Sequence, residues 1–268
     1  MHRRIVRYRW SKVHMRFSLF GILVLPLGLA LGCSPGEVSL GSVSYPGNGP
    51  LKLAEPVAAV PRGACPGSLR TVKSGPDVYG AWWEIRDDSS SILMVGRSVD
   101  QGATWKIVQP ADTLDRAVTG CARPAPAIAA DSSTNYVDVA YFLVSKEGPG
   151  VFFTHSMDAR TLGTGDGIFH SPVPVAYGDR PSDVSVAAKG DKLVVAYEDP
   201  SGERNMVGLA LSLTMGHIFE QRVIISQPTL PARNPTVAIR GDSVTVQWWE
   251  RPDSVLVGGR VAVRSASW

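Results

Sequence analysis

The chain has 268 residues, of which 44% are hydrophobic and 19% charged, and its formal net charge is +3. This length accommodates one domain with a substantial core after an export signal is removed. Six Lys or Arg residues and no acidic residue lie in the first 16 positions, so the rest of the chain is near neutral to slightly acidic. No basic patch is interleaved with aromatic residues, which argues against nucleic-acid binding.

The N-terminus has the pattern of a bacterial export signal. Residues 17–31 form an apolar run that is too short for a membrane span and suits the core of a signal peptide. The run ends in Leu29-Ala-Leu-Gly-Cys33, which resembles a lipobox. The resemblance implies a lipoprotein signal peptide over 1–32 and lipidation of Cys33. A plain secretory signal or a retained anchor is the alternative.

The residues after Cys33 refine the predicted location. Ser34 stands where an acidic retention signal would be, which favours the outer membrane, on its periplasmic side or at the cell surface. Residues 33–50 are rich in Gly, Ser and Pro and predict a flexible tether. The sequence therefore predicts an exported protein whose partner at its N-terminus is the membrane.

A turn motif of eight residues reads Ser98-Val-Asp100-Gln-Gly102-Ala-Thr104-Trp105. Gly102 suits a turn position with positive φ, and the Ser98 and Asp100 oxygens can accept bonds from backbone N–H groups in the turn. Trp105 can cover the turn with a large apolar face. The motif resembles the Asp-box, or BNR repeat, of the sialidase-like β-propeller family. The resemblance implies a structural role for the box, on the face away from any active site.

The box recurs along the chain in degraded form. A second copy spans 212–219, an interrupted copy begins at Ser156, and the start of a fourth lies at Ser265, so the four serines are 58, 56 and 53 residues apart. Apolar segments with strand-like alternation keep the same period, at 78–84, 137–142, 193–198 and 244–250. Periods of this length indicate repeat architectures such as propeller blades.

Each repeat is predicted to contain four strands. In the second repeat they lie near 125–131, 136–143, 150–156 and 168–176, and no convincing helical period follows residue 35. We therefore predict an all-β fold over 51–268, a sialidase-like β-propeller of about four four-stranded blades. The family usually has six or more blades, and this departure weakens any transfer of activity.

The ends of the repeat array predict two further features. The fourth repeat lacks its last strand, and residues 51–57 resemble the last strand of the first repeat, so we expect them to complete the fourth blade. The alternative is an incomplete ring, finished by another chain or left open. Cys65 and Cys121 precede the first strands of adjacent repeats, which predicts a disulfide in an exported protein rather than two separate buried thiols.

Charged residues gather in the loops that the propeller would place opposite the Asp-boxes. The selected ligand-binding candidates are Arg180, Arg233, Glu84 and Glu250. The family resemblance implies an arginine cluster that holds a carboxylate, with a Tyr nucleophile and acidic helpers. Arg180 and Arg233 match the arginine positions of two repeats, Arg123 is displaced by one position, and Tyr177 lies near the expected rim. No catalytic residue is assigned.

Other candidate sites are weaker. His155, His170 and His217 are scattered without metal-ligand spacing, so no metal or other cofactor is predicted. The pairs Trp82-Trp83 and Trp248-Trp249 can stack on sugars, although strand alternation favours packing.

The leading function is a membrane-held binding or assembly scaffold for a protein or glycan. The alternative is a sialidase-like glycoside hydrolase, and a third possibility resembles the Asp-box lipoproteins that assist photosystem assembly. Fold alone does not choose among them.

Overall fold

The computed structural model describes residues 38–46, 55–162, 169–202, 204–251 and 259–268. These residues form sixteen strands and one short 3-10 helix, η1 (Ala159–Thr161). The strands are β1 (Ser39–Leu40), β2 (Arg70–Ser74), β3 (Asp77–Ile85), β4 (Ser91–Ser98), β5 (Ile107–Asp112), β6 (Ala127–Asp131), β7 (Tyr136–Ser145), β8 (Gly148–Ser156), β9 (Val173–Tyr177), β10 (Val184–Lys189), β11 (Lys192–Glu198), β12 (Val207–Ser212), β13 (Gln221–Ile224), β14 (Ala232–Arg240), β15 (Ser243–Glu250) and β16 (Arg260–Ser267). Within the described ranges no helix has the length and hydropathy to cross a bilayer.

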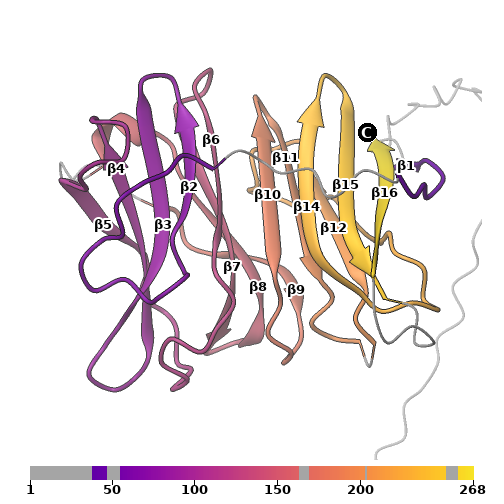
Figure 1. The fold of residues 1–268 in the computed structure, drawn as a ribbon, viewed down its shortest axis with the longest axis horizontal. Coiled ribbons are helices and arrows are strands. Elements are labelled where there is room, and N and C mark those ends of the chain that lie inside the picture. The colour runs from indigo at the N-terminus through magenta and orange to yellow at the C-terminus, as the bar shows by residue number, and fades with distance from the viewer. Residues whose placement is uncertain (1–37, 47–54, 163–168, 203, 252–258) are drawn as a thin grey trace, which may run out of the picture. The chain divides into compact units, whose positions relative to one another are not determined.

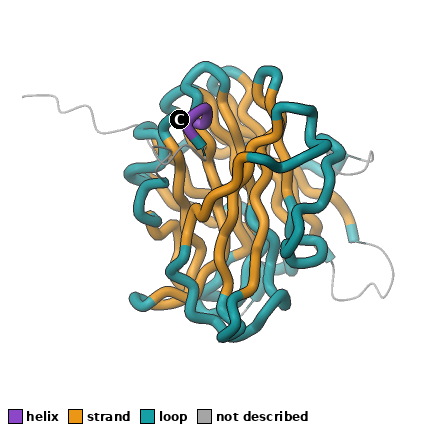
Figure 2. Tube along the Cα trace, turned by 90° about the vertical axis from the view of Figure 1, so that its left-hand side faces the viewer, coloured by secondary structure: helices purple, strands orange, loops and turns teal. Residues whose placement is uncertain are grey.

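The strands form four antiparallel four-stranded sheets, here called blades 1 to 4. Their orders are β2-β3-β4-β5, β6-β7-β8-β9, β10-β11-β12-β13 and β14-β15-β16-β1 (Figure 1). Figure 2 shows the connections gathered at the ends of the strands. The first strand of each blade is the innermost, because β2 packs beside β6, β6 beside β10 and β10 beside β14. The predicted four-bladed, all-β propeller fold is confirmed.

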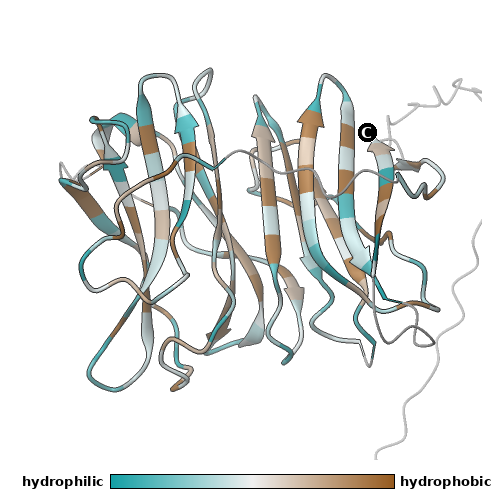
Figure 3. Ribbon diagram, in the orientation of Figure 1, coloured by the Kyte–Doolittle hydropathy of each residue, from teal (hydrophilic) through white to brown (hydrophobic). Residues whose placement is uncertain are grey.

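The core lies between the blades because the middle strands are apolar on both faces. On β7, Val139 and Tyr141 pack toward blade 1, whereas Ala140 and Phe142 pack toward blade 3. Along β10, β14 and β15, hydropathy alternates in bands in Figure 3, as expected where one face of a strand is more apolar than the other. Three buried clusters join blade 1 to 2, 2 to 3 and 3 to 4; among the described residues no such cluster joins blade 4 to blade 1.

One face of blade 1 is covered by two tryptophans of the blade itself, Trp82 of β3 and Trp105 of the connection between β4 and β5. Trp82 and Trp105 pack with their ring centroids 5.7 Å apart. Gly80 and Gly96 make room for them, since a Cβ on either glycine would lie within 2.7 Å of a ring carbon. Among the described residues, this packing buries the face of blade 1 that no other blade's core cluster covers.

An N-terminal strand completes blade 4, but it is not the predicted one. Leu40 of β1 lies opposite Ala266 of β16, and Val38, Leu40 and Val43 pack against the cluster between blades 3 and 4. Residues 39–40 belong to the segment predicted as a tether. Of the predicted strand 51–57, residues 51–54 lie outside the described residues and 55–57 are not in a strand. The chain there runs to the first Asp-box turn instead, where Ala59 N–H donates to the Gly102 carbonyl at 2.8 Å.

The predicted disulfide is present. Cys65 and Cys121 are bonded across a sequence separation of 56 residues, with their Cα atoms 5.4 Å apart. Cys65 precedes β2 and Cys121 precedes β6, so the bond joins the entrances of blades 1 and 2.

Candidate functional site

One candidate binding feature is a groove along the innermost strands. It has a volume of about 620 Å³ and is lined by residues of β2, β6, β10 and β14, many of them alanine. Asp183 and Asn234 stand at the end of the groove where these strands begin. We call Asp183, Glu198, Arg233, Asn234 and Trp249 the blade 3–4 mouth.

A chain of hydrogen bonds organises this mouth. The Asn234 backbone N–H donates to Glu198 Oε1 at 2.8 Å, and the Asn234 side-chain amide donates to Asp183 Oδ2 at 3.0 Å. Asn234 has a φ of +52°, a conformation that few residues other than glycine adopt, and it lies in a register irregularity of β14. Such irregularities redirect side chains next to functional sites.

The electrostatics of the mouth centre on Glu198. Burial raises the pKa of Glu198, and the charge of Asp183 acts in the same direction. The hydrogen bond from Asn234 and the charges of Arg233 and Arg180 oppose this rise in pKa. A half-buried carboxyl balanced in this way can accept hydrogen bonds from a ligand or exchange a proton with it.

An exposed tryptophan lies on the face of blade 4 opposite to that of Trp248, whose side chain packs toward blade 3. Trp249 of β15 is opposite Arg233 in the sheet register, so both side chains project from the same face of blade 4. Trp249 is 40% exposed, whereas Trp82, Trp83 and Trp248 are buried. The packing role predicted for the tryptophan pairs therefore describes three of these four residues, and Trp249 is the exception.

The four selected candidates do not come together. The Arg180 guanidinium donates to the carbonyls of Asp199 and Arg204, both at 2.9 Å, and so holds the loop between β11 and β12. Glu84 accepts from the Trp82 indole at 2.9 Å, in blade 1. In blade 4, Glu250 accepts in the same way from Trp248 at 3.0 Å and pairs with Arg260 at 3.3 Å.

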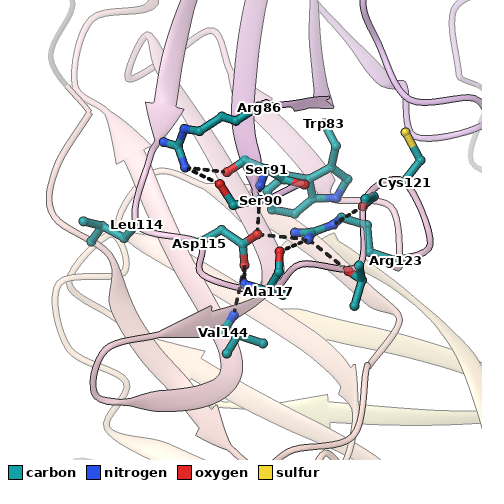
Figure 4. A network of polar contacts seen from close by, with 12 residues as sticks. Trp83, Arg86, Ser90, Ser91, Leu114, Asp115, Ala117, Cys121, Arg123 and Val144 are labelled. Atoms are coloured by element: carbon teal, nitrogen blue, oxygen red, sulfur yellow. Dashed lines mark hydrogen bonds and ion pairs between the residues drawn. The ribbon is translucent and has the colours of Figure 1, made fainter. Parts of the chain in front are cut away.

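Among the described residues, the arginine triad and Tyr nucleophile of a sialidase are not assembled. Arg123 is buried in an ion pair with Asp115 at 2.9 Å and lies over the Trp83 ring, at the junction of blades 1 and 2 (Figure 4). Tyr177 belongs to β9, the outermost strand of blade 2, where it packs edge-on against Phe152. Of the arginines considered, only Arg180 and Arg233 lie close enough to Glu198 to lower its pKa.

The polar atoms of the first Asp-box are occupied within its own turn. Ser98 Oγ accepts from Gly102 N–H at 2.7 Å, and Asp100 accepts from the Thr104 backbone N–H and hydroxyl at 2.9 and 2.6 Å. These bonds lower the pKa of Asp100 to about 2. The Trp105 indole donates to the Ala59 carbonyl. The box therefore stabilises the turn between β4 and β5 of blade 1.

The prediction that the three histidines are scattered was wrong. Ring nitrogens of His155, His170 and His217 all lie within 4.8 Å of one another. The signal for this cluster was present in the sequence. His155 directly precedes Ser156, where the interrupted box begins, His170 follows that box, and His217 lies within the box at 212–219. Box turns of consecutive repeats become neighbours when the blades stack.

Cys33 lies outside the described residues, so its lipidation stays a prediction.

Comparisons with known proteins bear on the fold alone. No family model matches the chain, and no curated protein matches it. Similar solved structures include a Hadza microbial sialidase, with 14% identity and a TM-score of 0.48 over 72% of this chain. An α-L-arabinofuranosidase from Podospora anserina has 12% identity and a TM-score of 0.46 over 78% of this chain and 68% of its own. The chain spans 45% of the sialidase.

Proposed function

We propose that this protein is an exported, membrane-anchored scaffold that binds a glycan at the blade 3–4 mouth. The observations that carry the proposal are the hydrogen-bonded chain Asp183–Asn234–Glu198 and the exposed Trp249, which pairs in the sheet with Arg233, the residue before Asn234. The anchor rests on the lipobox-like sequence that ends at Cys33.

The chemistry of the mouth suits a sugar. A sugar ring offers hydroxyls that donate and accept in fixed directions, and carboxylates with a side-chain amide satisfy both needs. Its C–H face is apolar and packs on an aromatic ring, as Trp249 provides. Arg233, exposed beside Trp249, adds a positive charge that favours a sugar with a carboxylate. An acidic oligosaccharide therefore fits the mouth better than a neutral one.

The test is a glycan array probed with the purified full chain. The affinity of the strongest oligosaccharide is then measured by calorimetry for the wild type, W249A, R233A and Y177A. Y177A is the matched control, because it removes an exposed aromatic ring from blade 2. We expect W249A and R233A to bind at least about tenfold more weakly, a loss of about 1.4 kcal/mol, with Y177A unchanged. An array without binding, or equal affinities for all four proteins, would contradict the proposal and direct the search to a protein partner.

A second candidate function is glycoside hydrolysis. It is favoured by the raised pKa of Glu198 and by the position of Asp183, since hydrolysis needs one carboxyl to donate a proton and a second to assist. E198Q separates the two functions, because glutamine keeps a hydrogen-bonding group but cannot transfer the proton. Release of reducing sugar by the wild type and its loss in E198Q, with binding retained, would establish the hydrolase. If the wild type releases none from glycans that it binds, the hydrolase is excluded.

A further inference from the structure

Three histidines from two neighbouring blades converge away from the blade 3–4 mouth. His155 ends β8 of blade 2, His170 lies in the segment before β9, and His217 belongs to the box turn that follows β12 of blade 3. Their ring centroids are 4.6, 4.8 and 5.3 Å apart. They line a cavity of about 290 Å³, together with residues that include Phe153, Ser171 and Gly216.

Close approach of the two blades creates this convergence. Gly216 has a φ of +86°, and a Cβ at this position would lie 2.1 Å from Cε1 of Phe153. Glycine therefore allows the box turn of blade 3 to rest on blade 2. The next residue, His217, is thereby placed beside His155.

Hydrogen bonds fix the tautomers of two of the rings. His155 Nδ1 lies 2.8 Å from the Met215 carbonyl, and His217 Nδ1 lies 2.7 Å from the Thr214 carbonyl. A carbonyl oxygen only accepts, so both Nδ1 atoms carry the proton. In a neutral ring the Nε2 lone pair is then available, and a backbone carbonyl on the other nitrogen is the usual support of a metal-binding histidine.

His155 has an unsatisfied nitrogen. Its side chain is 2% exposed, and within the described residues its buried Nε2 has no hydrogen-bond partner. The hydrogen bond at Nδ1 leaves the lone pair of this Nε2 facing the other two rings, in the form in which imidazole binds a metal. A buried polar atom without a partner costs stability, which a bound ion would recover.

We infer that His155, His170 and His217 bind a divalent late transition-metal ion, with Zn²⁺ as the representative ion. Imidazole ligands suit zinc, copper and nickel, whereas magnesium and calcium prefer oxygen ligands. Tetrahedral zinc with Zn–N bonds of about 2.0–2.1 Å needs its ligand atoms about 3.3 Å apart. The rings reach this spacing from 4.8 Å by side-chain rotation, which is open to His170 and His217 because neither is buried. Three protein ligands leave a fourth position for water or an external ligand, and the ion would clamp blade 2 to blade 3.

The test measures zinc binding by the full chain purified without a histidine tag. Calorimetry and thermal unfolding are run for the wild type, H170A, H217A and H155L, with Mg²⁺ as the negative control ion. H217A introduces the residue type of the matching position in the first box, Ala103, and H155L that of the matching position in the third repeat, Leu211. I218A is the matched control, because Ile218 is an exposed neighbour on the same turn.

We expect Zn²⁺ at a hundredfold excess over its Kd to raise the wild-type Tm by about 5–10 °C, and Mg²⁺ to leave it unchanged. I218A should match the wild type, while H170A and H217A should weaken zinc binding at least about tenfold. These two variants alter side chains that are not buried, so the test does not depend on the folding of H155L. Failure of the wild type to bind Zn²⁺, or equal binding by H170A, H217A and I218A, would overturn the inference.

Discussion

Removing the Cys65–Cys121 disulfide should destabilise the protein by several kcal/mol. The bond closes a chain segment of 56 residues, and the loop-closure entropy of the unfolded state gives about 4 kcal/mol for that length. The folded positions of the two cysteines do not depend on the bond alone. Cys65 N–H donates to the Trp83 carbonyl at 2.7 Å, and the Trp83 indole donates to the Pro124 carbonyl at 2.9 Å. The loss should therefore act mainly through the unfolded state.

Equilibrium unfolding in urea measures this effect on the wild type, the double variant C65A/C121A and the control C33S. With m near 2.5 kcal/mol/M, the double variant should unfold at a urea concentration roughly 1.5 M lower than the wild type. Its m value should rise, because the unfolded chain is no longer cross-linked. C33S should match the wild type, and the reduced wild type should match the double variant. A difference in unfolding free energy below about 1 kcal/mol would refute the entropic reasoning.

Three further predictions concern polar contacts of the first Asp-box and of the junction between blades 1 and 2. S98A should lose about 1–3 kcal/mol of unfolding free energy, since Gly102 N–H is left without its acceptor; unchanged urea unfolding would contradict this. The Asp100 carboxyl should titrate near pH 2 by NMR, because hydrogen bonds lower its pKa from 3.8. The stability that its carboxylate contributes is then present above about pH 3.8 and is lost as the pH falls toward 2, and a midpoint near 3.8 would show that these bonds are not formed. D115N should cost about 3–5 kcal/mol by leaving Arg123 buried without its counter-charge, and a thermal unfolding midpoint equal to that of the wild type would exclude this pair as a structural contact.

The repeated sequence segments predicted most of the fold, because their residue pattern depends on local strand and turn structure. The apolar segments at 78–84, 137–142, 193–198 and 244–250 all lie within the second strands of the blades, β3, β7, β11 and β15. Of these, β3, β7 and β11 are buried on both faces over most of their length, so their composition is distinctive. The strand β1 escaped prediction because two residues carry no period, and its pairing is decided by β16, more than 200 positions away.

The candidate site was harder to predict, because it depends on where each side chain points and on which residues of other blades it meets. Glu250 has the chemistry of a ligand-binding residue, yet it is fully buried and bonded to an indole two residues away. Glu198 ends β11 of blade 3 as Glu250 ends β15 of blade 4, but Glu198 accepts a hydrogen bond from Asn234 of the next blade. The histidine cluster likewise depends on which turns the blade stacking brings together. A motif that is analysed within one repeat does not predict which residues of two different repeats come into contact.

A crystal structure of the protein with its strongest array oligosaccharide tests the central claim most directly. The account predicts a sugar ring stacked on Trp249, with hydroxyls bonded to Glu198 or Asp183 and an acidic group near Arg233. A ligand bound elsewhere, whether along the inner groove away from Trp249 or on the Asp-box face, would contradict it.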